Sequence, residues 1–155
     1  MTPNNDDSQI LTWAMFCHLS SLLGLVLPFI GLPIPFANLL GPLGIWLYKK
    51  DQHPFINIEG KEAVNFQISV TIYSFLGFIA LVIFAVIYLF LILLASGRQS
   101  STAPSLLVFG TLVGGWLIAM LVIINLTALI LVIVAALKAK KGEHYRYPFT
   151  LRFLQ

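Results

Sequence analysis

The chain carries very little charge. Lys, Arg, Asp and Glu make up 10% of its 155 residues, whereas 59% of the residues are hydrophobic. A soluble domain has about 25% charged residues, so these side chains cannot cover a water-facing surface. The formal net charge of +3 is too small and too scattered for nucleic-acid binding. The composition therefore indicates an integral membrane protein with one compact bundle and a lipid bilayer around it.

Disulfide, metal and targeting signals are also scarce. The single cysteine, Cys17, excludes an internal disulfide and is expected to be a small packing residue. Three scattered histidines beside one cysteine give no metal-ligand spacing, so we expect no metal and no cofactor. Residues 1–8 form a polar tail without Lys or Arg, whereas a secretory signal needs a basic n-region. We expect the first apolar run to remain in the mature protein.

Sequence motifs of known catalytic chemistry are missing. The sequence contains no HExxH, no GxSxG, no phosphate loop, no dinucleotide fingerprint and no paired carboxylates. Glu59 and Glu62 lie near each other, but Lys61 stands between them and no further acid partner is evident. We therefore predict that the protein is not an enzyme.

Uncharged runs predict the helices. No charge occurs between Asp7 and Lys49 or between Glu62 and Arg98, and a crossing needs about 20 apolar residues. Three prolines and a glycine interrupt the first of these runs within residues 28–35, because proline disrupts helical hydrogen bonding. The predicted helices are residues 9–28, 36–48, 60–95 and 104–138.

The second predicted helix is short. Its roughly 13 residues span about 20 Å, against about 30 Å for the hydrocarbon core. It either crosses with its ends pulled in, or lies as a re-entrant or interfacial piece. The predicted class is an all-α integral membrane protein, with a bundle of four helices in one domain over residues 9–138. Gly142 is placed to end the fourth helix, and the basic and aromatic tail, residues 139–155, is interfacial or disordered.

One internal polar segment, residues 49–71, joins the two apolar halves; we call it the hub. All basic residues except Arg98 fall in the hub or near the C-terminus, and an even number of crossings separates these two groups. The positive-inside rule then places both in the cytoplasm, as for a multi-pass protein of a bacterial inner membrane. The N-terminus is cytoplasmic if the short helix crosses and outside if it does not.

The order of several short motifs resembles a widespread family of small bacterial membrane proteins of unknown function. That family is described as similar to the twenty-kilodalton Tic protein, a subunit of the chloroplast inner-envelope import channel. The resemblance covers nearly the whole chain and implies a four-helix membrane domain without known catalytic residues. The motifs are His18-Leu-Ser, Asn38-Leu-Leu-Gly-Pro-Leu-Gly-Ile-Trp46, Lys49-Lys50-Asp51, His53-Pro-Phe, Glu59-Gly-Lys-Glu-Ala-Val-Asn-Phe-Gln-Ile68 and Tyr145-Arg-Tyr-Pro-Phe149.

A polar stripe enters the third predicted helix. Glu62, Asn65, Ser69 and Tyr73 are spaced so that they share one helical face. Such a stripe in lipid must face protein or water, so it either lines a polar vestibule or ties helices together by hydrogen bonds. We expect Glu62 and Asn65 to bind another segment of the chain. The expected partners of Glu62 are Lys49, Lys50, His53 and Arg146.

His18 and Asn125 are polar residues deep in apolar runs. His18 is a candidate proton carrier or ligand, but a neutral imidazole bonded to Asn38 or Asn125 would serve packing equally well. Asn125 needs a partner because its amide cannot stay bare in lipid, so we expect it to bond across helices. The remaining candidate polar residues are Asn38, His53, Glu59, Lys61 and Gln67.

Small residues recur at a spacing of four in the last predicted helix. Gly110 with Gly114, and Gly115 with Ala119, predict close helix approach. The contact is either internal packing or a dimer face.

Two functions fit these features. The first is a non-enzymatic structural or accessory protein that binds itself or another membrane protein. The second is an oligomeric channel or transporter subunit, because polar residues lie in the apolar runs and broken helices often mark transport sites.

Overall fold

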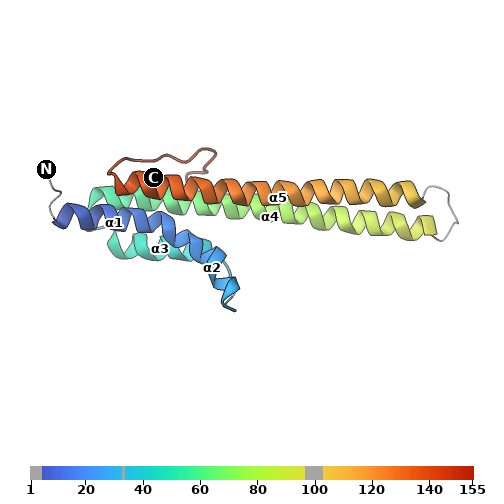
Figure 1. Ribbon diagram of the computed structural model, residues 1–155, viewed down its shortest axis with the longest axis horizontal. Coiled ribbons are helices and arrows are strands. Elements are labelled where there is room, and N and C mark those ends of the chain that lie inside the picture. Colours follow the sequence, from blue (N-terminus) through green and yellow to red (C-terminus); the bar gives the residue numbers. More distant parts are fainter. Residues whose placement is uncertain (1–4, 33, 97–102) are drawn as a thin grey trace. The chain divides into compact units, whose positions relative to one another are not determined.

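The computed structural model describes residues 5–32, 34–96 and 103–155 (Figure 1). No strand occurs among these residues, and the spans Asp6–Phe29, Pro54–Ala95 and Pro104–Lys140 are long and apolar enough to cross a membrane. The predicted all-α membrane class is therefore confirmed, with a first helix that is bent. The elements are α1 (Asn5–Leu19), the 3-10 helix η1 (Ser20–Leu22), α2 (Leu23–Phe29), α3 (Ala37–Lys49), α4 (Pro54–Ser96) and α5 (Ala103–Lys140).

The chain divides into two compact units. Unit 1 comprises Met1–Thr71 and Thr127–Gln155, and unit 2 comprises Ile72–Leu126. Helices α4 and α5 contribute to both units. The extent of a single membrane domain over residues 9–138 stays a prediction.

Two serines account for the break between α1 and α2. Ser20 Oγ donates to the Cys17 carbonyl at 3.3 Å, and Ser21 Oγ donates to the His18 carbonyl at 2.8 Å. Hydroxyls that bond carbonyls of the preceding turn compete with the helical ladder and bend helices. The helix tightens to η1 at this point, and α2 continues in a different direction (Figure 1).

In unit 1, α3 packs antiparallel against α1, η1 and α2 at very short range. A Cβ on Gly24 would lie 2.7 Å from the Asn38 Cβ, and one on Gly41 would overlap the Ser20 carbonyl. These two glycines therefore permit a backbone approach that any larger residue would prevent. The chain returns through a turn in which Gly31 and Phe36 have φ angles of 79° and 58°.

Helix α4 begins at Pro54, whereas the sequence predicted a start near residue 60. Proline suits the first helical position because the missing N–H would be unbonded there in any case. The preceding residue caps the helix, since the Phe55 N–H donates to His53 Nδ1 at 3.1 Å. His53 therefore contributes to the structure as a helix cap.

Helix α5 ends as its sequence predicts. Gly142 adopts a φ of 79°, and its N–H donates to the Ala139 carbonyl at 3.0 Å. The next N–H, of Glu143, donates to the Lys138 carbonyl at 3.0 Å. A left-handed glycine with such bonds is a common helix end, so the assignment of Gly142 is confirmed.

Two apolar clusters hold unit 1 together. In one, Phe66 of α4 and Val132 and Ala135 of α5 pack with Tyr147 of the C-terminal segment. In the other, Cys17 of α1 packs with α4. The second cluster consists of Cys17, Ile56 and Ala63.

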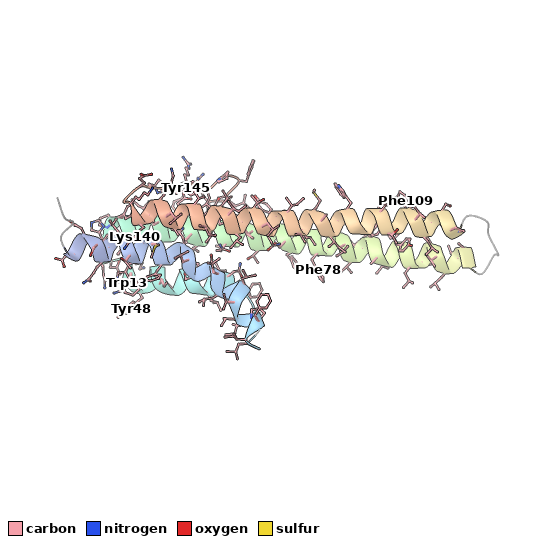
Figure 2. The ribbon with its side chains drawn as sticks, viewed as in Figure 1. Trp13, Tyr48, Phe78, Phe109, Lys140 and Tyr145 are labelled. Atoms are coloured by element: carbon pink, nitrogen blue, oxygen red, sulfur yellow. The ribbon has the colours of Figure 1, made fainter. Side chains whose placement is uncertain are left out.

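Unit 2 is a pair of apolar helices. Its part of α4, residues 72–96, is about 36 Å long at about 1.5 Å per residue, which suits a bilayer crossing. Gly77 lies against Leu121, because a Cβ added to this glycine would be 2.6 Å from Leu121 Cδ2. Phe78 and Phe109 point outward and are largely exposed, as expected of side chains that face lipid (Figure 2).

Of the two small-residue faces of α5, one packs against α4 and the other is exposed. A Cβ on Gly110 would overlap the ring of Tyr88, and one on Gly114 would lie 3.5 Å from Phe84. This face therefore packs inside the chain. Of the two predicted alternatives, internal packing or a dimer face, the first applies to Gly110 and Gly114. A Cβ on Gly115 would meet nothing within 4 Å, and Ala119 is exposed. The second face is thus open.

The close approach of α3 yields a test. Gly41→Ala should lower the free energy of unfolding by about 1–3 kcal/mol, because backbone must move to admit the methyl group. Gly44→Ala is the matched control on the same helix, where a Cβ meets nothing within 4 Å. There alanine should raise stability by about 0.5–1 kcal/mol. Unfolding in detergent micelles measures both, and effects of the same sign would contradict this packing.

Candidate functional site

A buried carboxylate joins three segments of unit 1. The Glu59 side chain on α4 is fully buried, and its Oε2 lies 3.0 Å from Nε2 of His18 on α1. Its Oε1 lies 2.6 Å from Nδ1 of His144, in the segment after α5. On the far side of His18, Nδ1 lies 2.9 Å from the Tyr147 hydroxyl. We call these four residues the Glu59 cluster.

The hydrogen atoms of the Glu59 cluster can be assigned so that each of its three contacts has one donor and one acceptor. Burial, and next the nearby Glu59 carboxylate, raise the pKa of the Tyr147 hydroxyl well above its usual value of 10. Tyr147 therefore keeps its proton and donates it to His18 Nδ1. His18 Nε2–H then donates to Glu59 Oε2, and His144 Nδ1–H donates to Glu59 Oε1.

The C-terminal segment places two members of the cluster. After α5 ends at Lys140, the chain turns back along unit 1 (Figure 1). The Tyr147 ring stacks on Phe66 of α4, with 3.9 Å between ring centroids and 8° between the planes. Tyr145 meets Tyr147 edge to face at 5.3 Å. Aromatic packing thus fixes the direction of the Tyr147 hydroxyl toward His18.

Asn65 and Ser69 of α4 bind the backbone of the last residues. Asn65 Oδ1 accepts from the N–H groups of Phe153 and Leu154 at 3.1 and 2.9 Å, and Asn65 Nδ2 donates to the Leu154 carbonyl at 2.9 Å. Ser69 Oγ accepts from the Leu151 N–H at 2.8 Å and donates to the Asn65 carbonyl at 2.8 Å. The polar stripe of α4 thus holds the C-terminal segment. It therefore does not face a vestibule at these positions.

Glu62 also contacts the C-terminal segment, but its partner differs from the expected ones. Glu62 Oε1 lies 3.5 Å from Arg152 Nε. The prediction of Lys49, Lys50, His53 or Arg146 was wrong, because α4 begins earlier than expected and the tail folds back along it. Among the described residues, Glu62 Oε2 is buried without a hydrogen-bond partner. Lys61 Nζ donates to the Gln155 carbonyl at 2.6 Å.

Asn38 and Gln67 meet each other. Asn38 Nδ2 donates to Gln67 Oε1 at 3.2 Å and to Thr71 Oγ1 at 3.1 Å. These bonds tie α3 to α4. The partners considered for a packing role of His18, Asn38 and Asn125, were wrong. At the level of His18, helix α1 faces α4 and the C-terminal segment, and His18 meets Glu59 and Tyr147 there.

Asn125 does not bond across helices in the expected way. Its side chain is exposed, and its Nδ2 donates to the Leu121 carbonyl of its own helix at 2.9 Å. An amide that bonds the preceding turn needs no second helix. The expectation of interhelical bonding was therefore wrong for this residue.

Basic and aromatic side chains gather at one end of unit 1 (Figure 2). Lys49 Nζ lies 4.3 Å from the Trp13 ring centroid and 4.8 Å from that of Tyr48. Lys140 Nζ donates to the Thr12 hydroxyl at 2.6 Å. Such pairs are typical of the membrane–water interface. We call the group the basic belt; it consists of Thr12, Trp13, Trp46, Tyr48, Lys49, Lys50, Lys138, Lys140 and Tyr145.

The Glu59 cluster is not arranged as a metal site. Both carboxylate oxygens already accept hydrogen bonds from the histidine nitrogens that face them, at 2.6 and 3.0 Å. Over residues 5–32, 34–96 and 103–155, no group of three or more His, Cys, Asp or Glu side chains is placed to hold a metal ion.

Sequence reasoning missed the part that the C-terminal segment contributes. His144, Tyr147 and Arg152 were assigned to a tail, and their partners lie more than eighty residues away in sequence. The available signal was the Tyr145-Arg-Tyr-Pro-Phe149 motif, because alternating aromatic residues are unusual in a disordered tail.

Over residues 9–154 the chain matches a family described as the magnetosome magnetite crystal formation protein family, MamF/MmsF. No curated protein and no solved structure matches the chain. The resemblance to a family of small membrane proteins is thus confirmed in this form. The likeness to the chloroplast import channel subunit is not part of the match and stays a prediction.

Substitution of Asn65 tests how strongly α4 binds the C-terminal segment. Asn65→Ala removes three hydrogen bonds at about 1 kcal/mol each, so we expect a loss of about 2–3 kcal/mol in the free energy of unfolding. The amides of Phe153 and Leu154 should also exchange hydrogen faster. Asn125→Ala is the control and should change stability by less than about 0.5 kcal/mol. Unchanged amide exchange in Asn65→Ala would contradict the contact.

The raised pKa of Tyr147 predicts an alkaline effect. The unfolded chain releases this proton near pH 10 and the folded chain does not, so the contribution of Tyr147 is full below pH 10 and declines above it. Tyr147→Phe should lose about 1 kcal/mol at pH 8 through the missing hydrogen bond. This deficit against the wild type should shrink at pH 11. Tyr145→Phe is the control. If the deficit of Tyr147→Phe is equal at both pH values, the raised pKa assigned to Tyr147 is refuted.

Proposed function

The chain belongs to the magnetosome magnetite crystal formation protein family, and from this premise we propose that it serves magnetite crystal formation as a non-enzymatic partner of other membrane proteins. It acts as a structural or accessory component. We place it in a bacterial membrane as a multi-pass protein, with the hub and the C-terminus in the cytoplasm. The basic residues near both segments support this orientation.

The proposal rests on the bonding partners of the polar residues in unit 1. Asn65 and Ser69 bind the backbone of the C-terminal segment, and His18 binds Glu59 and Tyr147. A transport path would need such groups to face water or a substrate. Since they bond one another and the backbone, they support an architectural role.

The open face of α5 is the candidate partner surface. A side chain added at Gly115 would meet nothing within 4 Å, and Ala119 one turn later is exposed. Small residues in this spacing let a second membrane helix approach closely. The partner is a second copy of this chain or another membrane protein.

An oligomeric channel or transporter subunit, similar to an import channel, is the alternative. The Glu59 cluster favours it, because four titratable side chains connect the half-exposed His144 to the buried Tyr147. Groups in such a chain can exchange protons.

The partner surface is tested in cells that form magnetosomes. A gene deletion is complemented with the wild type, with Gly115→Leu, or with Gly44→Leu as control, and a photo-crosslinker is placed at Ala119. We expect Gly115→Leu to remove the crosslinked product and to reduce crystal size in electron micrographs, because leucine blocks close helix approach. Gly44 is equally open but lies on α3, so its variant should behave as the wild type.

The alternatives separate by outcome. Normal crystals and an unchanged crosslink in Gly115→Leu would contradict the partner surface. Ion or proton flux into vesicles that contain the purified protein, lost in Glu59→Gln, would favour the channel instead.

A further inference from the structure

The segment between α1 and α3 is apolar, exposed and without charge. No charged residue occurs between Asp7 and Lys49. Phe29 is 84% exposed, and Ile30 and Phe36 are 63% and 61% exposed. Apolar patches of this kind on a single chain indicate contact with protein or lipid. The further exposed apolar residues of this segment are Leu25, Val26, Leu32 and Ile34.

The backbone of this turn bonds itself. The Ile30 and Leu32 N–H groups donate to the Leu27 carbonyl at 3.2 and 2.9 Å, and the Gly31 N–H donates to the Pro28 carbonyl at 3.2 Å. The Ile34 N–H donates to the Leu32 carbonyl at 2.8 Å, and Pro35 has no N–H to satisfy. Backbone donors must be bonded within the protein where no water is present. These internal bonds lower the cost of placing four N–H groups of the turn in hydrocarbon.

Helix α1 with η1 and α2 forms one leg of a helical hairpin, and α3 forms the other. Both legs run from the basic belt to the apolar turn. Trp13 of α1 faces Lys49 at the end of α3, and Thr12 accepts from Lys140 at the end of α5. The middle of α1, the end of α3 and the end of α5 are thus side by side in unit 1 (Figure 2). Because lysines of the belt suit the headgroup level, these three parts of the helices lie at one face of the bilayer.

Measured from the basic belt, the legs are too short to reach the other face, although the whole span Asp6–Phe29 has the length of a crossing. From Trp13 to Phe29 the helix rises about 24 Å, and the 13 residues of α3 rise about 20 Å. The hydrocarbon core alone is about 30 Å thick, and the bilayer with its headgroups about 40–45 Å. A turn that hangs from the headgroup level therefore ends near the bilayer centre.

We propose that α1, η1, α2 and α3 form a re-entrant hairpin whose turn inserts among the acyl chains of one leaflet. The occupant of the exposed apolar surface is the lipid of that leaflet. The N-terminus lies on the same side as the hub and the C-terminus, although the first helix does not cross. This inference concerns the membrane topology and is independent of a role in crystal formation.

Single cysteines in a Cys17→Ala background test the hairpin in vesicles of known orientation. Asp7→Cys and Gln155→Cys should react with a membrane-impermeant maleimide from the same side, and Gln99→Cys, between α4 and α5, from the opposite side. Leu32→Cys should react from neither. A fluorophore placed at Leu32→Cys before reconstitution should be quenched most by nitroxides near the ends of the acyl chains.

Each other outcome overturns the proposal. Labelling of Leu32→Cys from the side of Gln99 would show a full crossing. Labelling from the side of Gln155 without quenching by lipid nitroxides would place the turn in water. Labelling of Asp7→Cys from the side of Gln99 would separate the N-terminus from the belt. Equal melting temperatures of all variants in detergent control for folding, and Leu32 is exposed, so its replacement should be tolerated.

Discussion

The buried Glu59 carboxylate is the constraint on which unit 1 depends. A carboxylate without partners in an apolar interior is very costly, and removing one partner of a buried pair typically costs about 3–5 kcal/mol. Glu59 has no exposed surface, and its partners come from α1 and from the segment after α5. Helix α4 can therefore bury this residue only when both other segments are in place, which makes their assembly cooperative.

The C-terminal segment follows from the same constraint. It has no regular secondary structure, so its N–H groups need partners from elsewhere. Asn65 and Ser69 supply these partners for Leu151, Phe153 and Leu154. The polar stripe of α4 thus replaces the strand or helix ladder that the segment lacks. This explains why polar residues enter an otherwise apolar helix.

Helices could be predicted from the sequence where a local rule decides them. Charge-free runs located the helices, and Gly142 marked the end of α5, because length and left-handed backbone are local properties. The contacts of the site could not be predicted in the same way. The polar stripe predicted that Asn65 binds another segment of the chain, and it does, but which segment could not be read from the spacing. Asn125 was also expected to bond outside its own helix, yet it bonds the preceding turn. The identity of each partner depends on which segment lies beside the helix in the folded chain.

The two units meet the bilayer in different ways, and the difference lies in their polar groups. In unit 2 the described side chains are almost all apolar, and helices of about 36 Å need no special partner in lipid. In unit 1 several polar side chains bond inward to the Glu59 cluster and the C-terminal segment, and the lysines of the basic belt lie at one end. Elsewhere apolar residues such as Phe29 and Phe36 are on the outside. The exposed apolar side chains of both units suit contact with lipid, as expected of helices that are long and apolar enough to cross a membrane.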